Sequence, residues 1–177
     1  MSENGAKKRR PSGSIRAMDF RIEGLSPQPF AHLFAMDDDE LARHWAVKRV
    51  ADSKPGFPCR VMLEDAEPGA TVLLVNYEHL PVDSPYRASH AIYVSGWSGK
   101  AFDQVNVVPQ ALRDRLLSLR AFDAAGMMVD ADITDGAKLE ALIERLLAQP
   151  RVEYLHAHFA RRGCYAARIE RAITSSR

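Results

Sequence analysis

The clearest hydrophobic pattern of the chain lies in its C-terminal third. Residues 136–148 carry an apolar stripe with spacings of three and four residues, formed by Leu139, Leu142, Ile143, Leu146 and Leu147. This spacing predicts an amphipathic helix that buries its apolar face. Pro150 follows within three residues of the stripe, where a helix commonly ends.

Apolar runs on either side of this segment predict strands. Residues 127–133 precede the helix and residues 152–159 follow it, which gives a strand–helix–strand unit. Such a unit has parallel strands and places its helix over one face of the sheet. We expect these two strands to be neighbours. The turn-forming residues 123–126 further predict a hairpin between residues 117–122 and residues 127–133.

The same reading predicts the other elements. They are a first strand at 18–25, helices within 26–36 and 37–47, a central strand at 71–77, a strand at 91–96 and a short helix around 109–117. Residues 164–173 fit either a helix or a strand. The sum is a single α+β domain over residues 18–177, with a mixed, mainly antiparallel sheet, helices packed on one face and a C-terminal β-α-β unit.

Charge is unevenly distributed along the chain. The formal net charge is +1, but residues 1–17 hold five basic residues and one acid, and the remainder carries 19 basic and 22 acidic groups. A mildly acidic body argues against nucleic-acid binding. Residues 1–17 have little to bury, so we expect a disordered basic tail. Its run Lys-Lys-Arg-Arg is typical of solvated charge, although it could also contact an anionic partner.

Composition indicates the class of protein. A hydrophobic share of 46% and a charged share of 27% are typical of a soluble globular protein. No apolar run approaches the roughly 18 residues of a membrane helix, and no signal peptide is recognisable. Two distant cysteines do not make a disulfide framework. We therefore expect a cytoplasmic protein without a membrane partner, and the sequence predicts no oligomeric state.

Two histidines at alternate positions give the first candidate site. Because side chains alternate across a strand, His156 and His158 share one face, and the same holds for Asp130 and Asp132. If the strands are neighbours, these four side chains converge on the sheet face opposite the helix. Imidazoles and carboxylates together would suit a divalent metal such as zinc. The alternative is the solvent-facing side of a half-exposed sheet.

Cys164 is a second candidate. It follows Gly163 and lies close to Arg161 and Arg162. If a helix begins here, its N-terminus and the arginines would lower the pKa of the thiol and make it a nucleophile. The alternative is a small buried residue behind a glycine turn.

A third candidate is a set of arginines and serines in loops. Arg60 follows a stiff loop with two prolines, and Arg87 lies between two serines in a loop bracketed by His79 and His90. Arginine with serine hydroxyls can clamp a carboxylate or a phosphate, whereas single arginines more often form surface ion pairs. The predicted anion-binding residues are Arg60, Arg87, Arg161, Arg162 and Ser89.

Four long segments resemble the bacterial family called domain of unknown function 1203. They are ADSKPGFPCRVMLEDAEPG, NYEHLPVDSPYRASHAIYV, LRAFDAAGMMVDADI and HAHFARRGCYAARIERA. The resemblance extends over about residues 18 to 173 and leaves out the basic tail. It implies a single bacterial domain, and it implies no activity, cofactor or residue role.

Two functions from different classes follow from these candidates. The first is an enzyme with metal-assisted or His/Cys-based hydrolytic chemistry on a small anionic molecule. In it His156, His158 and Cys164 are catalytic, an aspartate assists, and the arginines hold the substrate. The second is a non-catalytic binding protein for a small carboxylate or phosphate. A purely structural role is a third alternative.

Overall fold

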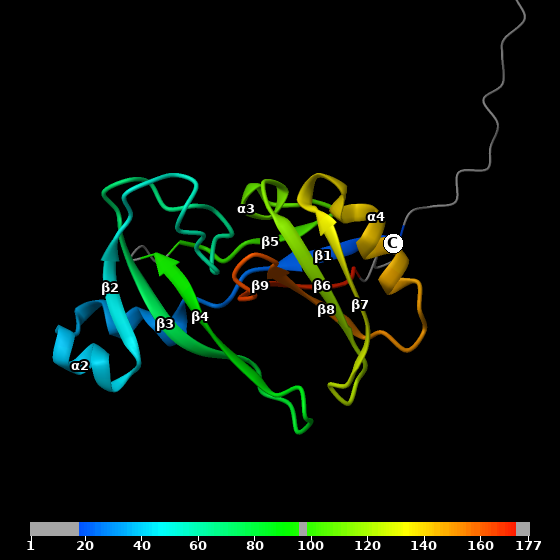
Figure 1. The fold of residues 1–177 in the computed structure, drawn as a ribbon, viewed down its shortest axis with the longest axis horizontal. Helices are drawn as coiled ribbons and strands as arrows, with labels where there is room; N and C mark the ends of the chain where they lie inside the picture. Colours follow the sequence, from blue (N-terminus) through cyan, green and yellow to red (C-terminus); the bar gives the residue numbers. More distant parts are fainter. Residues whose placement is uncertain (1–17, 96–98, 173–177) are drawn as a thin grey trace, which may run out of the picture.

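The computed structural model describes residues 18–95 and 99–172, and it arranges nine strands in two antiparallel sheets (Figure 1). The larger sheet has the order β5-β1-β9-β8-β6-β7. Its strands are β1 Phe20–Glu23, β5 Asp103–Val105, β6 Leu116–Phe122, β7 Met128–Asp135, β8 Tyr154–Phe159 and β9 Tyr165–Arg171. The smaller sheet has the order β2-β3-β4, with β2 Ala46–Val50, β3 Thr71–Leu80 and β4 Ala88–Ser95. The α+β class is confirmed, and the strands are divided between two sheets.

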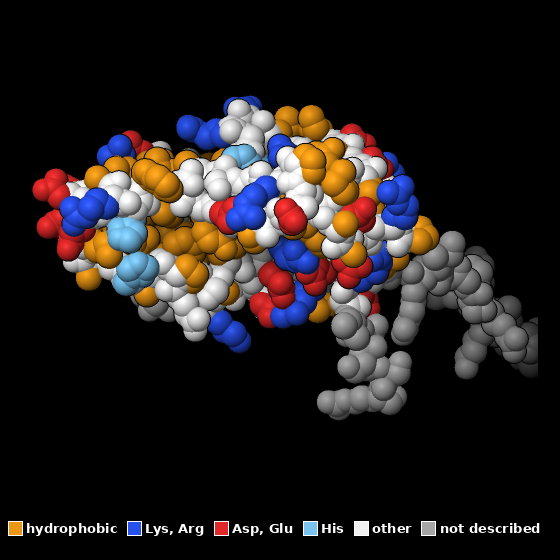
Figure 2. All heavy atoms as spheres, turned by 90° about the horizontal axis from the view of Figure 1, so that it is seen from below, with side chains coloured by type: hydrophobic (Ala, Val, Ile, Leu, Met, Phe, Trp, Pro, Cys, Tyr) orange, Lys and Arg blue, Asp and Glu red, His pale blue; other side chains and the backbone are white. Residues whose placement is uncertain are grey.

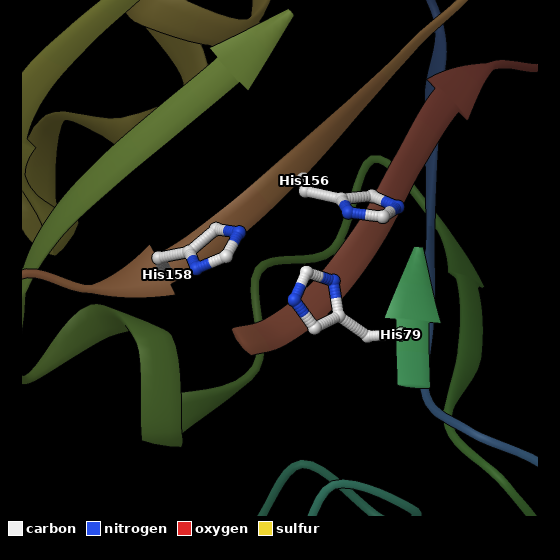
Figure 3. Close-up of side chains that lie close together, drawn as sticks. All are labelled: His79, His156 and His158. Carbon is white, nitrogen blue, oxygen red and sulfur yellow. The ribbon is translucent and has the colours of Figure 1, made fainter. Parts of the chain in front are cut away.

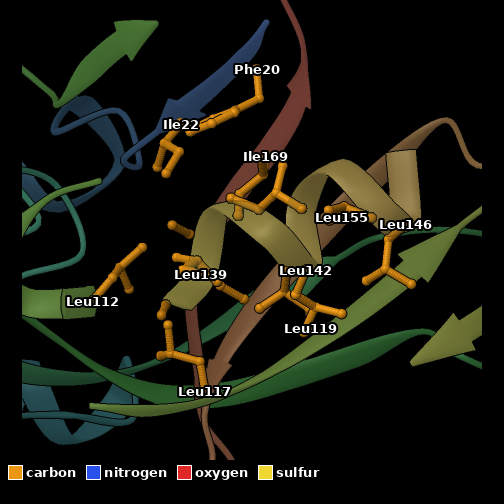
Figure 4. Close-up of a cluster of buried hydrophobic side chains, with 14 of the residues drawn as sticks. Phe20, Ile22, Leu112, Leu117, Leu119, Leu139, Leu142, Leu146, Leu155 and Ile169 are labelled. Atoms are coloured by element: carbon orange, nitrogen blue, oxygen red, sulfur yellow. The ribbon is translucent and has the colours of Figure 1, made fainter. Parts of the chain in front are cut away.

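The predicted C-terminal helix is α4, Leu139–Leu147, preceded by a short 3-10 turn. All five residues of its apolar stripe are buried. They pack on one face of the larger sheet, where Leu119, Leu155 and Ile169 belong to the same core (Figure 4). Burial of an apolar face on this scale is the dominant stabilising contribution to such a layer.

The β6–β7 hairpin is confirmed, but one detail of the β7-α4-β8 unit differs from the prediction. β6 pairs with β7 on one side and with β8 on the other, both antiparallel. β7 and β8 therefore run in the same direction without being neighbours. β6 lies between them, because one of its edges pairs with β7 and the other pairs with β8.

A β-bulge changes which face the β7 residues occupy. The register pairs Phe122 with Met128 but Ala121 with Asp130, so Val129 is an extra residue. Beyond the bulge, Asp132 lies opposite Leu119, and both Leu119 and Ala121 are in the core beneath α4. Since paired residues share a face, Asp130 and Asp132 are on the α4 face. The prediction that they share a face with the histidines is wrong.

The face of the larger sheet opposite α4, here called the histidine face, is covered by the β3–β4 hairpin. Leu80 packs there against Phe122 and Tyr154. At the hairpin tip the Ser84 hydroxyl donates a hydrogen bond of 2.9 Å to the carbonyl oxygen of Gly126 in the β6–β7 turn. Figure 1 shows the two turns approaching each other. The histidine face is therefore an internal junction between the sheets and not a solvent-facing surface.

The N-terminal helices are shorter than predicted. They are α1 Gln28–Ala31, a 3-10 turn at His32–Ala35 and α2 Asp38–Arg43, which is capped by Asp37. Trp45 lies beyond α2 at φ 49° and is 79% exposed, although the predicted helix extended to residue 47. In Figure 2 hydrophobic side chains are exposed over this part of the molecule beside charged and histidine side chains, and charges of both signs are interspersed over the rest of that face.

Three further predictions concern the short helix near residue 110, residues 164–173 and the basic tail. The short helix α3 is Gln110–Arg113, and β6 begins at Leu116, earlier than expected. Residues 164–173, which were compatible with a helix or a strand, provide the strand β9. The basic tail at 1–17 lies outside the described residues. Among the described helices none is sufficiently long and apolar to cross a membrane.

Candidate functional site: a buried histidine cluster

His156 and His158 point away from α4, as the alternation along β8 predicts. Leu155 and Ala157 belong to the core beneath α4, and the two imidazoles are on the histidine face. They are 1% and 0% exposed, because the β3–β4 hairpin covers them. Two side chains of this polarity are buried in full only where a partner or a function compensates for the lost water.

A third histidine, from the smaller sheet, completes the group. His79 lies on β3 at a bulge, where the register passes from Glu78 opposite Ser89 to Leu80 opposite Ala88 and leaves His79 unpaired in the ladder. Figure 3 shows its ring directed toward the two imidazoles of β8. One ring nitrogen of each histidine lies within 4.8 Å of those of the other two, and all three residues are buried. We call His79, His156 and His158 the histidine cluster.

Aromatic stacking holds His79 in place. Its ring is stacked on His90 of β4, with 4.6 Å between centroids, and on Tyr165 of β9, with 4.8 Å. Tyr165 also meets the edge of His156 at 4.9 Å. A bulge in β9 sets the position of Tyr165, because His158 lies opposite Tyr165 while Ala157 lies opposite Ala167. Bulges of this kind commonly redirect side chains at functional sites.

The hydrogen bonding of the cluster is incomplete. His158 Nδ1 lies 3.0 Å from the carbonyl oxygen of Gly163, so it donates a proton there and leaves the lone pair of Nε2 free. His158 Nε2, His156 Nδ1 and both ring nitrogens of His79 are buried without a hydrogen-bond partner among the described residues. A histidine bound through one nitrogen to a carbonyl oxygen is the usual arrangement of a metal ligand.

Burial keeps these imidazoles uncharged. It lowers the pKa of His79 to about 4, that of His156 to about 2 and that of His158 to about 3, and neighbouring cationic groups add to the effect. Near pH 7 the three rings are therefore neutral. Neutral imidazole is the form that binds a metal ion.

The number of imidazoles in the cluster matches the three protein ligands of a catalytic zinc site. Zinc binds imidazole nitrogen at about 2.0–2.1 Å, so three such ligands lie about 3.4 Å from one another. In the structure the corresponding ring nitrogens lie within 4.8 Å of one another, which is wider than this spacing. Three histidines and no carboxylate favour zinc or another first-row divalent ion over magnesium or calcium.

Arg120 brings a positive charge to the same face. It lies on β6 directly opposite His156, and its charge contributes to the low pKa of His79, His156 and His158. Burial lowers its own pKa. Within the described ranges its guanidinium has neither a carboxylate within 4.0 Å nor a hydrogen bond. A half-buried guanidinium with this environment is suited to bind an anion.

Asp130 and Asp132 are not part of this site. Asp130 accepts a hydrogen bond of 2.6 Å from the amide of Gln149, and Asp132 accepts one of 2.5 Å from Arg145 on α4. Both carboxylates are engaged on the opposite face of the sheet. The bulge at Val129 is the physical reason, because it reverses the alternation that the sequence pattern implied.

Cys164 and three of the predicted arginines line a separate pocket between the sheets. Its lining includes Arg60, Arg161, Arg162 and Cys164, together with His90. Cys164 is half-buried, and its sulfur accepts a hydrogen bond of 3.0 Å from the Arg60 guanidinium. It precedes a strand and not a helix, so the predicted helix N-terminus next to the thiol is absent.

Arg87 and Ser89 are elsewhere. Arg87 is exposed and forms an ion pair of 2.6 Å with Glu78. Ser89 lies opposite Glu78 in the β3–β4 ladder and is also exposed. Neither residue lines the pocket. The structure therefore separates the predicted anion-binding residues into a pocket group and a surface group.

These features define an α+β protein with two antiparallel sheets and a buried histidine cluster at their junction. The chain belongs to the family described as "Protein of unknown function (DUF1203)", whose sequence model matches residues 56–171. The matched range contains the whole histidine cluster, Arg120 and the arginines of the pocket. No curated protein and no solved structure matches the chain.

Proposed function

We propose that this protein is a metal-dependent enzyme that hydrolyses a small anionic molecule. The observation that carries the proposal is the histidine cluster, in which each of three buried, neutral imidazoles places one ring nitrogen within 4.8 Å of the other two and has at least one nitrogen without a hydrogen-bond partner. A buried polar atom without a partner costs about 1–3 kcal/mol, so four such atoms in one place favour a ligand, and a single ion would satisfy three of them, one on each ring. A divalent cation is the ligand that neutral imidazoles bind best.

The residues around the cluster have complementary roles. His79, His156 and His158 would hold the ion, which would supply a water molecule acidified toward neutral pH and ready to attack. Gly163 orients His158 through its carbonyl oxygen, and Tyr165 and His90 fix the ring of His79 by stacking. Arg120 would hold the anionic group of the substrate and offset its charge beside the ion.

Hydrolysis assays with and without metal test this function. Chelator-treated protein, reloaded with zinc, manganese or cobalt, would be assayed with 4-nitrophenyl phosphate and with neutral 4-nitrophenyl acetate. We expect at least one metal to accelerate hydrolysis about 100-fold or more over the metal-free protein. Arg120→Met should raise KM for the anionic substrate about tenfold and leave the neutral ester unaffected, because only the former has a charge to bind.

Matched variants decide between the cluster and adventitious metal. His156→Ala should abolish the metal-dependent rate, whereas His32→Ala, which removes an exposed histidine outside the cluster, should retain it. Equal rates in the two variants, or equal rates with and without metal in the wild type, would refute the proposed activity.

A further inference from the structure

The arginine-lined pocket is a second cavity, distinct from the histidine cluster. It lies between the two sheets, with a volume of about 1040 Å³, and it is bounded by residues of the loop 55–60, of β4, of the segment 113–116 and of the β8–β9 turn. This volume is that of a small-molecule binding site. His90 is shared, since it lines the pocket and stacks on His79.

Arg60 is the central cation of this pocket. It is only 2% exposed, yet each of its three hydrogen bonds goes to a group without a formal negative charge, namely the carbonyl oxygens of Tyr165 and Pro58 and the sulfur of Cys164. A guanidinium has five N–H groups, so two of those of Arg60 have no hydrogen-bond partner among the described residues. A buried cation without a carboxylate is costly, and an anion in the pocket would offset that cost.

The other arginines of the pocket fall into two groups. Arg113 and Arg115 are neutralised by Glu140 and Asp65, each through two hydrogen bonds. Arg161 and Arg162 are exposed on the β8–β9 turn and have no carboxylate partner among the described residues. Together with Arg60 they provide three positive charges in the lining of the pocket that no acid of the described residues pairs with.

Two acidic residues also belong to the lining of the pocket. Asp114 and Asp135 also line it, from the same two segments as Arg113 and Gly136. They would repel an anion placed beside them. Arg60, Arg161 and Arg162 have no carboxylate within 4.0 Å among the described residues. Three guanidinium groups suit an oxyanion with two negative charges better than a single carboxylate.

We propose that this pocket binds a small phosphorylated molecule, with its phosphate group held by Arg60, Arg161 and Arg162. The site goes beyond the proposed hydrolytic function, because none of the three arginines belongs to the histidine cluster and binding does not require a metal ion. Its phosphate group would lie next to Cys164, whose sulfur is already within hydrogen-bonding distance of Arg60.

Two measurements on the metal-free full-length protein test this site. Inorganic phosphate should bind in isothermal titration calorimetry with a Kd below about 1 mM, and acetate at equal ionic strength should not bind measurably. Phosphate should also slow the iodoacetamide labelling of Cys164 about fivefold or more, because it would cover the thiol. Cys59, which is 2% exposed, serves as the internal reference that labels only after denaturation.

Variants locate the effect. Arg60 is buried, so its removal could disturb folding; the double variant Arg161→Ala/Arg162→Ala changes exposed residues only. We expect it to weaken phosphate binding about tenfold or more, and Arg87→Ala, an exposed arginine outside the pocket, to leave binding unchanged. Absence of saturable phosphate binding, unprotected Cys164, or equal affinity in the double variant would overturn the proposal. Because binding at these arginines requires no metal ion, the absence of a metal from the histidine cluster would leave the outcome of this test unchanged.

Discussion

Addition of zinc to the metal-free protein should raise its Tm by about 5–10 °C when free zinc is about 100 times the Kd. An ion that binds only the folded state stabilises it by about 2.7 kcal/mol at that concentration. For a chain of this length, 1 kcal/mol corresponds to about 2–4 °C. The physical source is the histidine cluster, whose unpartnered buried nitrogens gain a ligand. Differential scanning calorimetry with and without zinc measures the shift.

Two variants assign this stabilisation to particular residues. His79→Ala removes the ligand that comes from the smaller sheet, so zinc should shift its Tm by less than about 2 °C. His32→Ala breaks the exposed pair of His32 and His44, whose ring centroids are 6.0 Å apart, and should keep the full shift. A full shift in the first variant and none in the second would mean that zinc binds at the surface pair.

The second large effect is a loss of folding stability at acidic pH. The folded-state pKa values of His79, His156 and His158 are about 4, 2 and 3, whereas the unfolded value of histidine is about 6.5. Below pH 6.5 the unfolded chain therefore binds protons that the folded chain excludes, and stability falls as pH falls. Each histidine contributes up to about 1.4 kcal/mol per pH unit until its folded pKa is reached. We expect the metal-free protein to unfold cooperatively between about pH 4 and 6.

A variant without one titrating group tests this explanation. His79→Phe retains a ring that can stack between His90 and Tyr165 but cannot bind a proton. Its acid midpoint, followed by circular dichroism, should lie about half a pH unit below that of the wild type. His44→Phe, at an exposed position, should leave the midpoint unchanged. Identical midpoints for the wild type and His79→Phe would show that His79 is not held neutral by burial.

Much of the C-terminal fold follows from the sequence because its signals are local. The spacing of Leu139, Leu142 and Leu146 determines which face of α4 is buried, and strand alternation places His156 and His158 on the face opposite Leu155. Both patterns depend only on the regular geometry of one element. The α+β class follows from the same signals.

Features that depend on irregular geometry or on contacts between sheets were not predictable in this way. His79 is 77 residues from His156 in the chain, and it reaches the cluster through a bulge in β3 and the packing of the β3–β4 hairpin. The bulge at Val129 has the opposite effect on Asp130 and Asp132, since it moves both carboxylates to the α4 face. A one-residue insertion in a ladder leaves no periodic signal in the sequence.

Arg120 illustrates a different reason. In the sequence it resembles an ordinary polar residue of a half-buried strand. Its proximity to four histidines arises only from sheet pairing and from the covering hairpin. The sequence predicted that Arg60 binds an anion, because this residue follows a stiff loop with two prolines. Its burial comes from tertiary packing, and the same packing leaves its guanidinium without a carboxylate partner among the described residues.

Metal stoichiometry is the most direct test of the central claim that His79, His156 and His158 form a metal centre. Protein purified without chelator or affinity-tag metal would be analysed by elemental mass spectrometry, next to folded His79→Ala and His156→Ala/His158→Ala variants. We expect close to one first-row divalent ion per wild-type chain and almost none in either variant. A folded wild type that contains no metal, and takes up none from zinc, manganese, iron or nickel, would contradict the claim.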